Sequence, residues 1–166
     1  MAEKSEVYKG VVKHKGFWNY SEIYKFAYAW LKDEGYNISE DNYTEKVTSF
    51  GKEIAIKWTS KKKVSDYFRN IITVSWHILG MTDSEIERAG KKEKTNKGEI
   101  KLTFTATPER DYEKRWEDKP FWKMMRGVYD KYVIRTTMDE YEDRLQSKVL
   151  KFIEETKSFL QLEGKH

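Results

Sequence analysis

The stretch TSKKKVSDYFRNIITVSWHILG, residues 59–80, joins a cluster of three lysines to a long alternation of side chains. Every second residue from Ile72 to Ile78 is large and apolar. Successive side chains of a β-strand point to opposite sides, so these residues share one face, and Ser75 and His77 lie on the other. The stretch therefore predicts a strand with one buried face that follows a basic turn.

The same period of two recurs on both sides of this stretch, and turn-forming residues separate the segments. Short spacings favour antiparallel hairpins, because a parallel return needs a crossover of a dozen or more residues. The expected strands cover residues 7–12, 43–50, 52–59, 64–79, 84–90 and 99–107. The expected turns between the last four strands fall at residues 60–63, 80–83 and 91–98.

Helical spacing appears before and after the strands. Apolar residues from Ile23 to Leu31 recur at i, i+3, i+4, i+7 and i+8, which predicts one amphipathic helix. Asn19 or Ser21 can cap its start, and Gly35 can take the left-handed conformation at its end.

The tail of the chain predicts two further helices. Pro120 suits the first turn of one helix, which carries a wide apolar stripe. A β-branched segment at residues 133–137 marks a break. Thr137 and Glu140 then resemble a capping box that begins the second helix.

This order predicts a single α+β domain over residues 1–166. We expect an antiparallel meander sheet of five or six strands, with the N-terminal helix and two C-terminal helices packed on one face. The order resembles the helix-grip layout of START-type domains, in which a long C-terminal helix closes a curved sheet over a cavity. The resemblance concerns the layout alone. Candidate cavity-lining residues are Trp58, Trp76, His77, Phe104, Met124 and Met125.

Composition limits the classes of function. The 32 basic and 28 acidic residues give a net charge of only +4, so binding to a polyanion requires local clustering of charge. The chain has no cysteine, and its three histidines lie far apart in sequence. Phosphate-loop, dinucleotide-binding, nucleophile-elbow and zinc-protease motifs are missing. These features favour a protein that is not an enzyme and that needs no metal or cofactor, although they leave enzymatic activity open.

Membrane and secretion signals are also missing from the sequence. The first residues lack the apolar segment of a signal peptide, and no run of about 18 apolar residues occurs. We therefore expect a cytoplasmic protein without a transmembrane segment.

The lysines support the functional hypothesis. Consecutive turns of a meander alternate between the two ends of a sheet, so the expected turns at 60–63 and 91–98 would share one end. That end would gather Lys61, Lys62, Lys63, Lys91, Lys92, Lys94 and Lys97. Lysine-rich turns also occur as soluble tips that protect sheet edges from aggregation, and this alternative stays open.

Two classes of function follow. The leading hypothesis is a non-catalytic binding or assembly module that contacts an acidic partner through this lysine-rich end. The acidic partner would be RNA, a ribonucleoprotein or an acidic protein surface. The alternative is a carrier of an apolar small molecule or lipid, held in a cavity between the sheet and the C-terminal helices. A homo-oligomeric structural role is a further hypothesis.

Overall fold

The computed structural model describes residues 3–4, 8–65, 68–110 and 135–164. Its elements alternate between strands and helices in the order expected for an α+β protein. They are β1 (Glu3–Lys4), β2 (Tyr8–Trp18), α1 (Tyr20–Asp33), β3 (Asn37–Thr48), β4 (Gly51–Lys63), β5 (Phe68–Arg88), β6 (Lys91–Arg110) and α3 (Arg135–Gly164).

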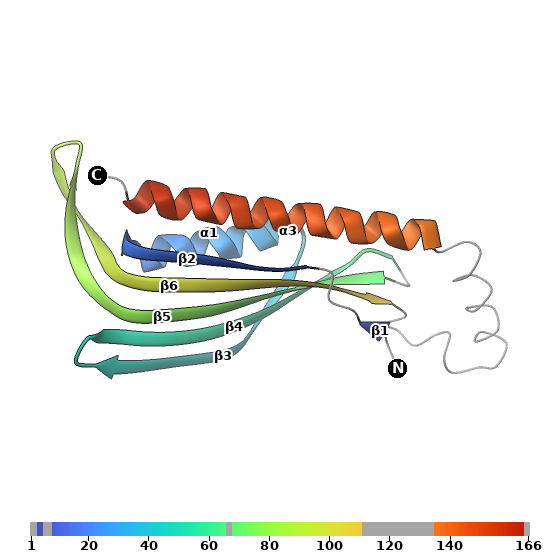
Figure 1. Cartoon of the computed structure of the whole chain (residues 1–166), viewed down its shortest axis with the longest axis horizontal. Helices are drawn as coiled ribbons and strands as arrows, with labels where there is room; N and C mark the ends of the chain where they lie inside the picture. Colours follow the sequence, from blue (N-terminus) through green and yellow to red (C-terminus); the bar gives the residue numbers. More distant parts are fainter. Residues whose placement is uncertain (1–2, 5–7, 66–67, 111–134, 165–166) are drawn as a thin grey trace.

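The strands form one antiparallel sheet. Both β1 and β2 pair with β6, and the order then continues through β5 and β4 to β3. Figure 1 shows that the sheet is strongly curved and that α1 and α3 lie on its concave side. Helix α3 packs mainly on β2 and β6. The predicted α+β class and the antiparallel sheet are confirmed.

Several strands are longer than the sequence suggested. The expected strands 64–79 and 84–90 belong to the single strand β5, so the expected turn at 80–83 is wrong. The pairing of β5 with β6 shifts its register between Leu79 and Thr82, and Gly80 between them has a positive φ of 62°. A bulge of this kind bends a strand without ending its pairing. The expected turn at 91–98 is likewise wrong, because β6 begins at Lys91.

The tail also differs from the expectation. Helix α3 begins at Arg135, so Thr137 already has helical backbone and does not start the helix. The structure describes one C-terminal helix, whereas we expected two. The helix expected after Pro120 lies outside the described residues, as do Met124 and Met125. No helix in the described ranges is both long enough and apolar enough to cross a bilayer.

The core lies between the concave face of the sheet and the two helices. The buried residues of α1 are Ile23, Ala27 and Leu31, which confirms the predicted apolar face. From α3 the core receives Leu145, Val149, Phe152, Ile153 and Leu160.

Three candidate cavity-lining residues are parts of this packed core. The ring centroids of Trp58 and Trp76 lie 5.0 Å apart, and those of Phe104 and Phe152 are also 5.0 Å apart. Their side chains are at most 2% exposed. His77 is half-exposed, with its Nε2 3.7 Å from Glu53. The expectation that His77 lines the interior is wrong, because strand alternation turns it away from the face of its neighbour Trp76.

Candidate anion-binding site

The candidate lysines divide between the two ends of the sheet. Lys63 pairs with Arg69 near the start of β5, whereas Lys91 pairs with Arg88 at its end. The strand between these two positions runs for roughly 60 Å at the usual rise per residue. The expected single basic end is therefore wrong. Because the chain does not turn at 80–83, the next hairpin points to the opposite end.

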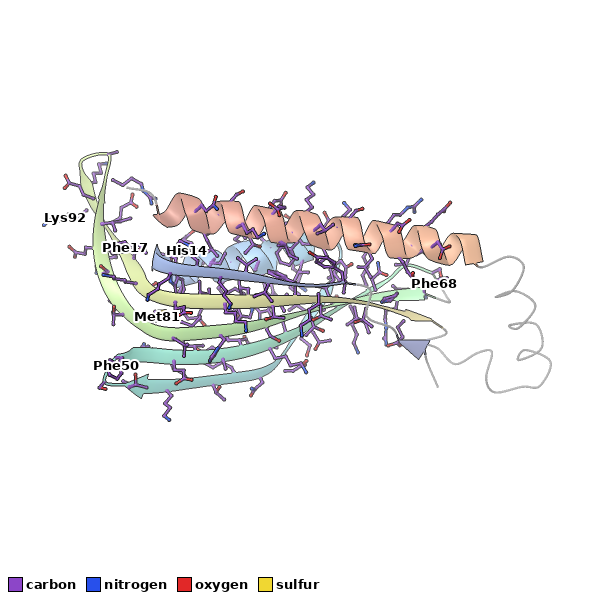
Figure 2. The ribbon with its side chains drawn as sticks, in the orientation of Figure 1. His14, Phe17, Phe50, Phe68, Met81 and Lys92 are labelled. Carbon is purple, nitrogen blue, oxygen red and sulfur yellow. The ribbon has the colours of Figure 1, made fainter. Side chains whose placement is uncertain are left out.

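Lysines Lys91, Lys92, Lys94 and Lys97 belong to the hairpin formed by residues 82–97, which we call the β5–β6 arm. Figure 2 shows Lys92 near the tip of this arm, at the end of the molecule opposite Phe68. Glu87 lies directly across the hairpin from Lys92, and Glu85 lies across from Lys94.

The charges of the β5–β6 arm nearly cancel. Arg88 and Glu93 form an ion pair with a distance of 3.6 Å. The basic residues of the arm are Arg88, Lys91, Lys92, Lys94 and Lys97, and the acidic ones are Asp83, Glu85, Glu87 and Glu93. The arm is thus one charge from neutrality and offers no strong attraction to an anion.

The other end of the sheet differs because basic residues of α3 join the lysines of β4. Here a pocket of about 270 Å³ lies between the end of α1, the end of β4 and the first half of α3. We call it the basic pocket. It is lined by Glu34, Tyr36, Lys62, Lys63, Val64, Asn70, Tyr141, Arg144, Leu145 and Lys148. Four of these side chains are cationic and one is a carboxylate, so the pocket concentrates positive charge.

The end of α1 builds one wall and the floor of the basic pocket. Gly35 has a φ of +92°, the left-handed conformation expected of a glycine that ends a helix. Its N–H donates to the carbonyl of Lys32, and the N–H of Tyr36 donates to the carbonyl of Leu31. This pair of bonds is the Schellman motif. The motif directs the chain so that Tyr36, only 5% exposed, becomes part of the pocket floor.

Strand β4 contributes its final residues. Buried residues at positions 54, 56, 58 and 60 mark the concave face, so Lys62 also belongs to that face. Lys62 lies opposite Asn70 of β5, and both line the basic pocket. The neighbouring Lys61 is exposed, belongs to the other face and does not line the pocket.

Helix α3 closes the basic pocket with one of its faces. Tyr141, Arg144, Leu145 and Lys148 occur at i, i+3, i+4 and i+7, the spacing of residues that lie on one side of a helix. Leu145 is fully buried and fixes this face against the core, while Arg144 and Lys148 remain exposed.

The lining of the basic pocket contains an ion pair and a contact between a cation and an aromatic ring. Nζ of Lys148 lies 3.3 Å from a carboxylate oxygen of Glu34. Nζ of Lys62 lies 5.8 Å from the centroid of the Tyr36 ring, which is within the range of a cation–π contact. Four of the lining side chains are cationic and one is a carboxylate, a composition that favours an anion.

Tyr36 is a neutral hydrogen-bonding group at the floor of the basic pocket. Burial raises the pKa of Tyr36 to about 12. A hydrogen bond from Asn70 opposes this rise in pKa, and the negative charge of Glu34 adds to it. The phenol therefore keeps its proton at physiological pH.

The lysines predicted from the sequence include Lys62 and Lys63 of this lining and do not include the two basic residues of α3. Arg144 and Lys148 stand beside the apolar stripe that predicts the second tail helix. Their i, i+4 spacing was visible in the sequence. The sequence does not show which strand this helix face would meet, or at which end of the sheet. Both depend on how α3 lies across the sheet.

A second pocket of about 520 Å³ lies where the β5–β6 arm meets the start of α1. The side chain of Asn96 accepts a hydrogen bond from the backbone N–H of Tyr20 at 2.9 Å. The lining of this pocket includes Asp83, Glu85 and Lys94. Its mixed charge gives no preference for an anion, so the basic pocket is the stronger candidate site.

The fold and the site define an α+β protein with a cationic pocket at one end of a curved antiparallel sheet. Within the described ranges, no three histidine, aspartate or glutamate side chains lie close enough together to hold a metal ion. Comparisons with protein-family models, with curated proteins and with solved structures find no significant match.

Proposed function

We propose that the protein is a non-catalytic binding module that holds an anionic group of an acidic partner in the basic pocket. The observation that supports this proposal is the meeting of Lys62 and Lys63 with Arg144 and Lys148 around one pocket. The proposal keeps the class of function expected from the sequence and replaces the shared lysine end with a smaller site.

The chemistry of the lining suits an anion. Lysine supplies a compact charge with three donors, and arginine supplies a planar group that can bind two oxygens at once. These residues come from two different elements, β4 and α3, so a folded chain presents them together in a fixed arrangement. Electrostatic attraction of this kind contributes most at low salt and also speeds association.

The candidate lining residues do not support the alternative function, a carrier of an apolar ligand in a cavity between the sheet and the C-terminal helices. Trp58 and Trp76 pack on one another, and Phe104 packs on Phe152. These candidate lining residues are therefore occupied with contacts inside the core. The three of them line none of the pockets described above.

A titration against two polyanions tests the proposal. Fluorescence anisotropy is measured with a labelled single-stranded RNA of ten nucleotides and with polyglutamate, at 50 and 200 mM salt. We expect salt-dependent binding to at least one of them, because displaced counterions weaken such binding as salt rises. The double variant Lys62→Glu and Arg144→Glu is expected to bind at least tenfold more weakly.

The β5–β6 arm provides the matched control. The double variant Lys91→Glu and Lys92→Glu carries the same change in net charge at the opposite end of the sheet. We expect it to lose less than threefold in affinity. Equal losses for both double variants would show that only net charge matters and would refute the site. Circular dichroism confirms that each variant is folded.

A further inference from the structure

A third pocket lies on the convex face of the sheet, which faces away from both helices. It has a volume of about 780 Å³ and is lined by residues of β2, β6, β5 and the hairpin formed by β3 and β4. Leu79 and Glu99 line it and lie opposite one another on β5 and β6. Each follows or precedes a buried residue of the concave face, Ile78 or Ile100, so strand alternation places the pocket on the other face. We call it the convex groove.

The lining of the convex groove is mostly apolar. Three neighbouring strands contribute a glycine each, so that backbone and no side chain forms this part of the lining. Leu79 is 38% exposed beside them. The groove is therefore suited to receive an apolar side chain from another molecule. Its glycines are Gly16, Gly80 and Gly98.

Phe50 is an exposed aromatic residue at the edge of the same groove. It lines the groove and is 85% exposed, the largest value among the exposed large apolar residues that the structure describes. Figure 2 shows it at the tip of the β3–β4 hairpin. Single exposed apolar side chains are common on protein surfaces, whereas one that stands beside an apolar groove marks an interaction surface. Covering an aromatic ring removes about 150–250 Å² of its surface from water.

The turn that carries Phe50 is held in place by its own hydrogen bonds. The hydroxyl of Thr48 accepts a hydrogen bond from the N–H of Phe50 at 3.2 Å and donates one to the carbonyl of Gly51 at 2.7 Å. The turn also packs on the bulge of β5, because a Cβ at Gly51 would lie 2.7 Å from the backbone carbon of Gly80. A side chain on a fixed turn loses less conformational freedom on binding, so Phe50 is preorganised to dock.

The charges of the convex groove suit a second copy of the same chain. Glu53 belongs to β4, on the side of the groove next to the β3–β4 hairpin, whereas the lining lysines belong to β2 and β6 on the other side. A two-fold axis turns these two sides onto each other and brings Glu53 of each copy toward the lysines of the other. The lining has no net charge, since its charged residues are two lysines and two glutamates: Lys15, Lys97, Glu53 and Glu99.

A two-fold axis also fits the position of Phe50 beside the groove. In an isologous contact both copies use the same surface, so a projecting group and the recess next to it meet their counterparts at the same time. With the axis between Phe50 and Leu79, the ring of each copy would lie over Leu79 and the glycine backbone of the other. One axis therefore covers two exposed rings and fills two grooves.

We propose that the protein forms a two-fold symmetric dimer in which Phe50 of each copy docks into the convex groove of its partner. The contact is built on two aromatic side chains, so the dimer is reversible and dissociates on dilution. This inference goes beyond the proposed function, because the convex groove shares no residue with the basic pocket and lies at the other end of β4.

Sedimentation equilibrium of the whole chain, at concentrations from 5 to 500 µM, tests the proposal. We expect the average mass to rise with concentration from that of one chain toward that of two. Phe50→Ser should weaken the association at least tenfold, because the ring that fills the groove is lost. A mass that stays at one chain over the whole range would refute the dimer.

Val47→Ser is the matched control for loss of an exposed apolar side chain. Val47 belongs to the same hairpin and is 76% exposed. It alternates with Thr48, which lines the groove, so it belongs to the other face of the sheet. We expect Val47→Ser to weaken the association less than threefold. Equal losses for Val47→Ser and Phe50→Ser would refute the assignment to the convex groove.

A mixture of two variants tests whether the ring enters the groove of the other copy. Leu79→Lys keeps Phe50 and places a charge in the groove, whereas Phe50→Ser keeps the groove and lacks the ring. Each variant alone loses both contacts of the dimer, and the mixed pair retains one. The mixture should therefore associate at least threefold more strongly than either variant alone. No gain on mixing would refute docking of the ring in the groove, and circular dichroism shows that both variants are folded.

The outcomes separate this inference from the proposed function. Phe50→Ser should leave the affinity for RNA and polyglutamate unchanged in dilute solution. A chain that binds a polyanion and stays monomeric would refute the dimer and support the module. A dimer that binds neither polyanion would do the reverse. Assemblies larger than a dimer that depend on Phe50 would refute the two-fold axis, because contacts of unlike surfaces do not close on themselves.

Discussion

The two ends of the sheet carry similar numbers of lysines and differ in what surrounds them. In the β5–β6 arm, strand pairing places Glu87 opposite Lys92 and Glu85 opposite Lys94. At the basic pocket, the strand lysines instead meet Arg144 and Lys148 of α3. Cross-strand pairing therefore offsets the lysines of the arm, whereas packing of a helix on the sheet adds basic residues beside the lysines of β4. The charge of a lysine cluster depends on its tertiary neighbours and not on its density in sequence.

The two ends also differ in how their glycines are packed. Gly51, near the bulge of β5, has a φ of +123°, and a Cβ there would lie 2.7 Å from the backbone carbon of Gly80. Gly35, at the basic pocket, has a φ of +92°, and a Cβ there would meet only the side chain of Lys62, at 3.5 Å. A flexible side chain can move, whereas paired backbone cannot move without breaking the sheet.

The largest expected effect follows from this difference. Gly51→Ala should lower the free energy of unfolding by about 3 kcal/mol or more, because steric overlap adds to the strain of a positive φ. Gly35→Ala should lower it by about 1–2 kcal/mol, the cost of the left-handed conformation alone. Urea unfolding of both variants measures the two values. Equal losses of unfolding free energy would contradict the claim that paired backbone packs against Gly51 while only a flexible side chain lies beside Gly35.

Alkaline pH gives the next effect, because a tyrosine is shielded from solvent at each end of helix α1: Tyr20 begins the helix and is partly buried, and Tyr36 follows the end of the helix and is buried. Burial raises the pKa of Tyr20, near the arm, and raises that of Tyr36, at the basic pocket, to about 12. In the unfolded chain both titrate near 10. The stability they confer is thus fully present below pH 10 and is lost as pH rises from 10 toward 12. Tyr36 alone accounts for a loss on the order of 2 kcal/mol across that range.

Urea unfolding at pH 9, 10, 11 and 12 measures this loss. Tyr36→Phe should flatten the part of the profile between pH 10 and 12, because phenylalanine has no proton to lose. Tyr28→Phe, at an exposed position of helix α1, is the matched control for removal of a hydroxyl group. Identical profiles for the wild type and for Tyr36→Phe would contradict the burial of this phenol.

The sequence predicted the local features of the fold and misplaced one turn. The α1 helix, its end at Gly35 and its buried face follow from local spacing and were confirmed. The continuity of β5 was missed, because Gly80 and the residues after it have the composition of a turn. Composition cannot distinguish a bulge, where pairing resumes, from a turn, where the chain reverses. This single error moved four lysines to the wrong end of the sheet.

The basic pocket was only partly predictable for a similar reason. Lys62 and Lys63 are close in sequence and were identified as a cluster. Their partners Arg144 and Lys148 are about eighty residues away, and no local pattern links them to β4. Their contribution depends on the direction in which α3 crosses the concave face, which is set by core residues such as Leu145 and Phe152.

The neutrality of the β5–β6 arm can be broken directly. Removing its two cross-strand carboxylates with Glu85→Gln and Glu87→Gln leaves Lys94 and Lys92 unopposed. We expect about fivefold tighter binding of single-stranded RNA at 50 mM salt, and a steeper salt dependence, because two more cations can displace counterions. The change is best made in the background of Lys62→Glu and Arg144→Glu, where the basic pocket no longer contributes. An unchanged affinity for RNA would contradict the view that these two glutamates prevent the lysines of the arm from binding anions.

The smallest effect on stability is expected at the ion pair between Lys148 and Glu34. Both side chains are partly exposed, at 51% and 27%, so solvent screens the pair. Lys148→Ala should therefore change the free energy of unfolding by less than about 1 kcal/mol.

The same substitution leaves the Glu34 carboxylate unopposed beside the bound anion and should weaken anion binding about fivefold. Glu34→Gln removes that carboxylate and should strengthen anion binding by a similar factor. Unfolding and anisotropy titrations of the two variants therefore test whether this pair tunes affinity without holding the fold together. A change of the same sign in both affinities would mean that the pair acts through packing of α3 and not through its charges.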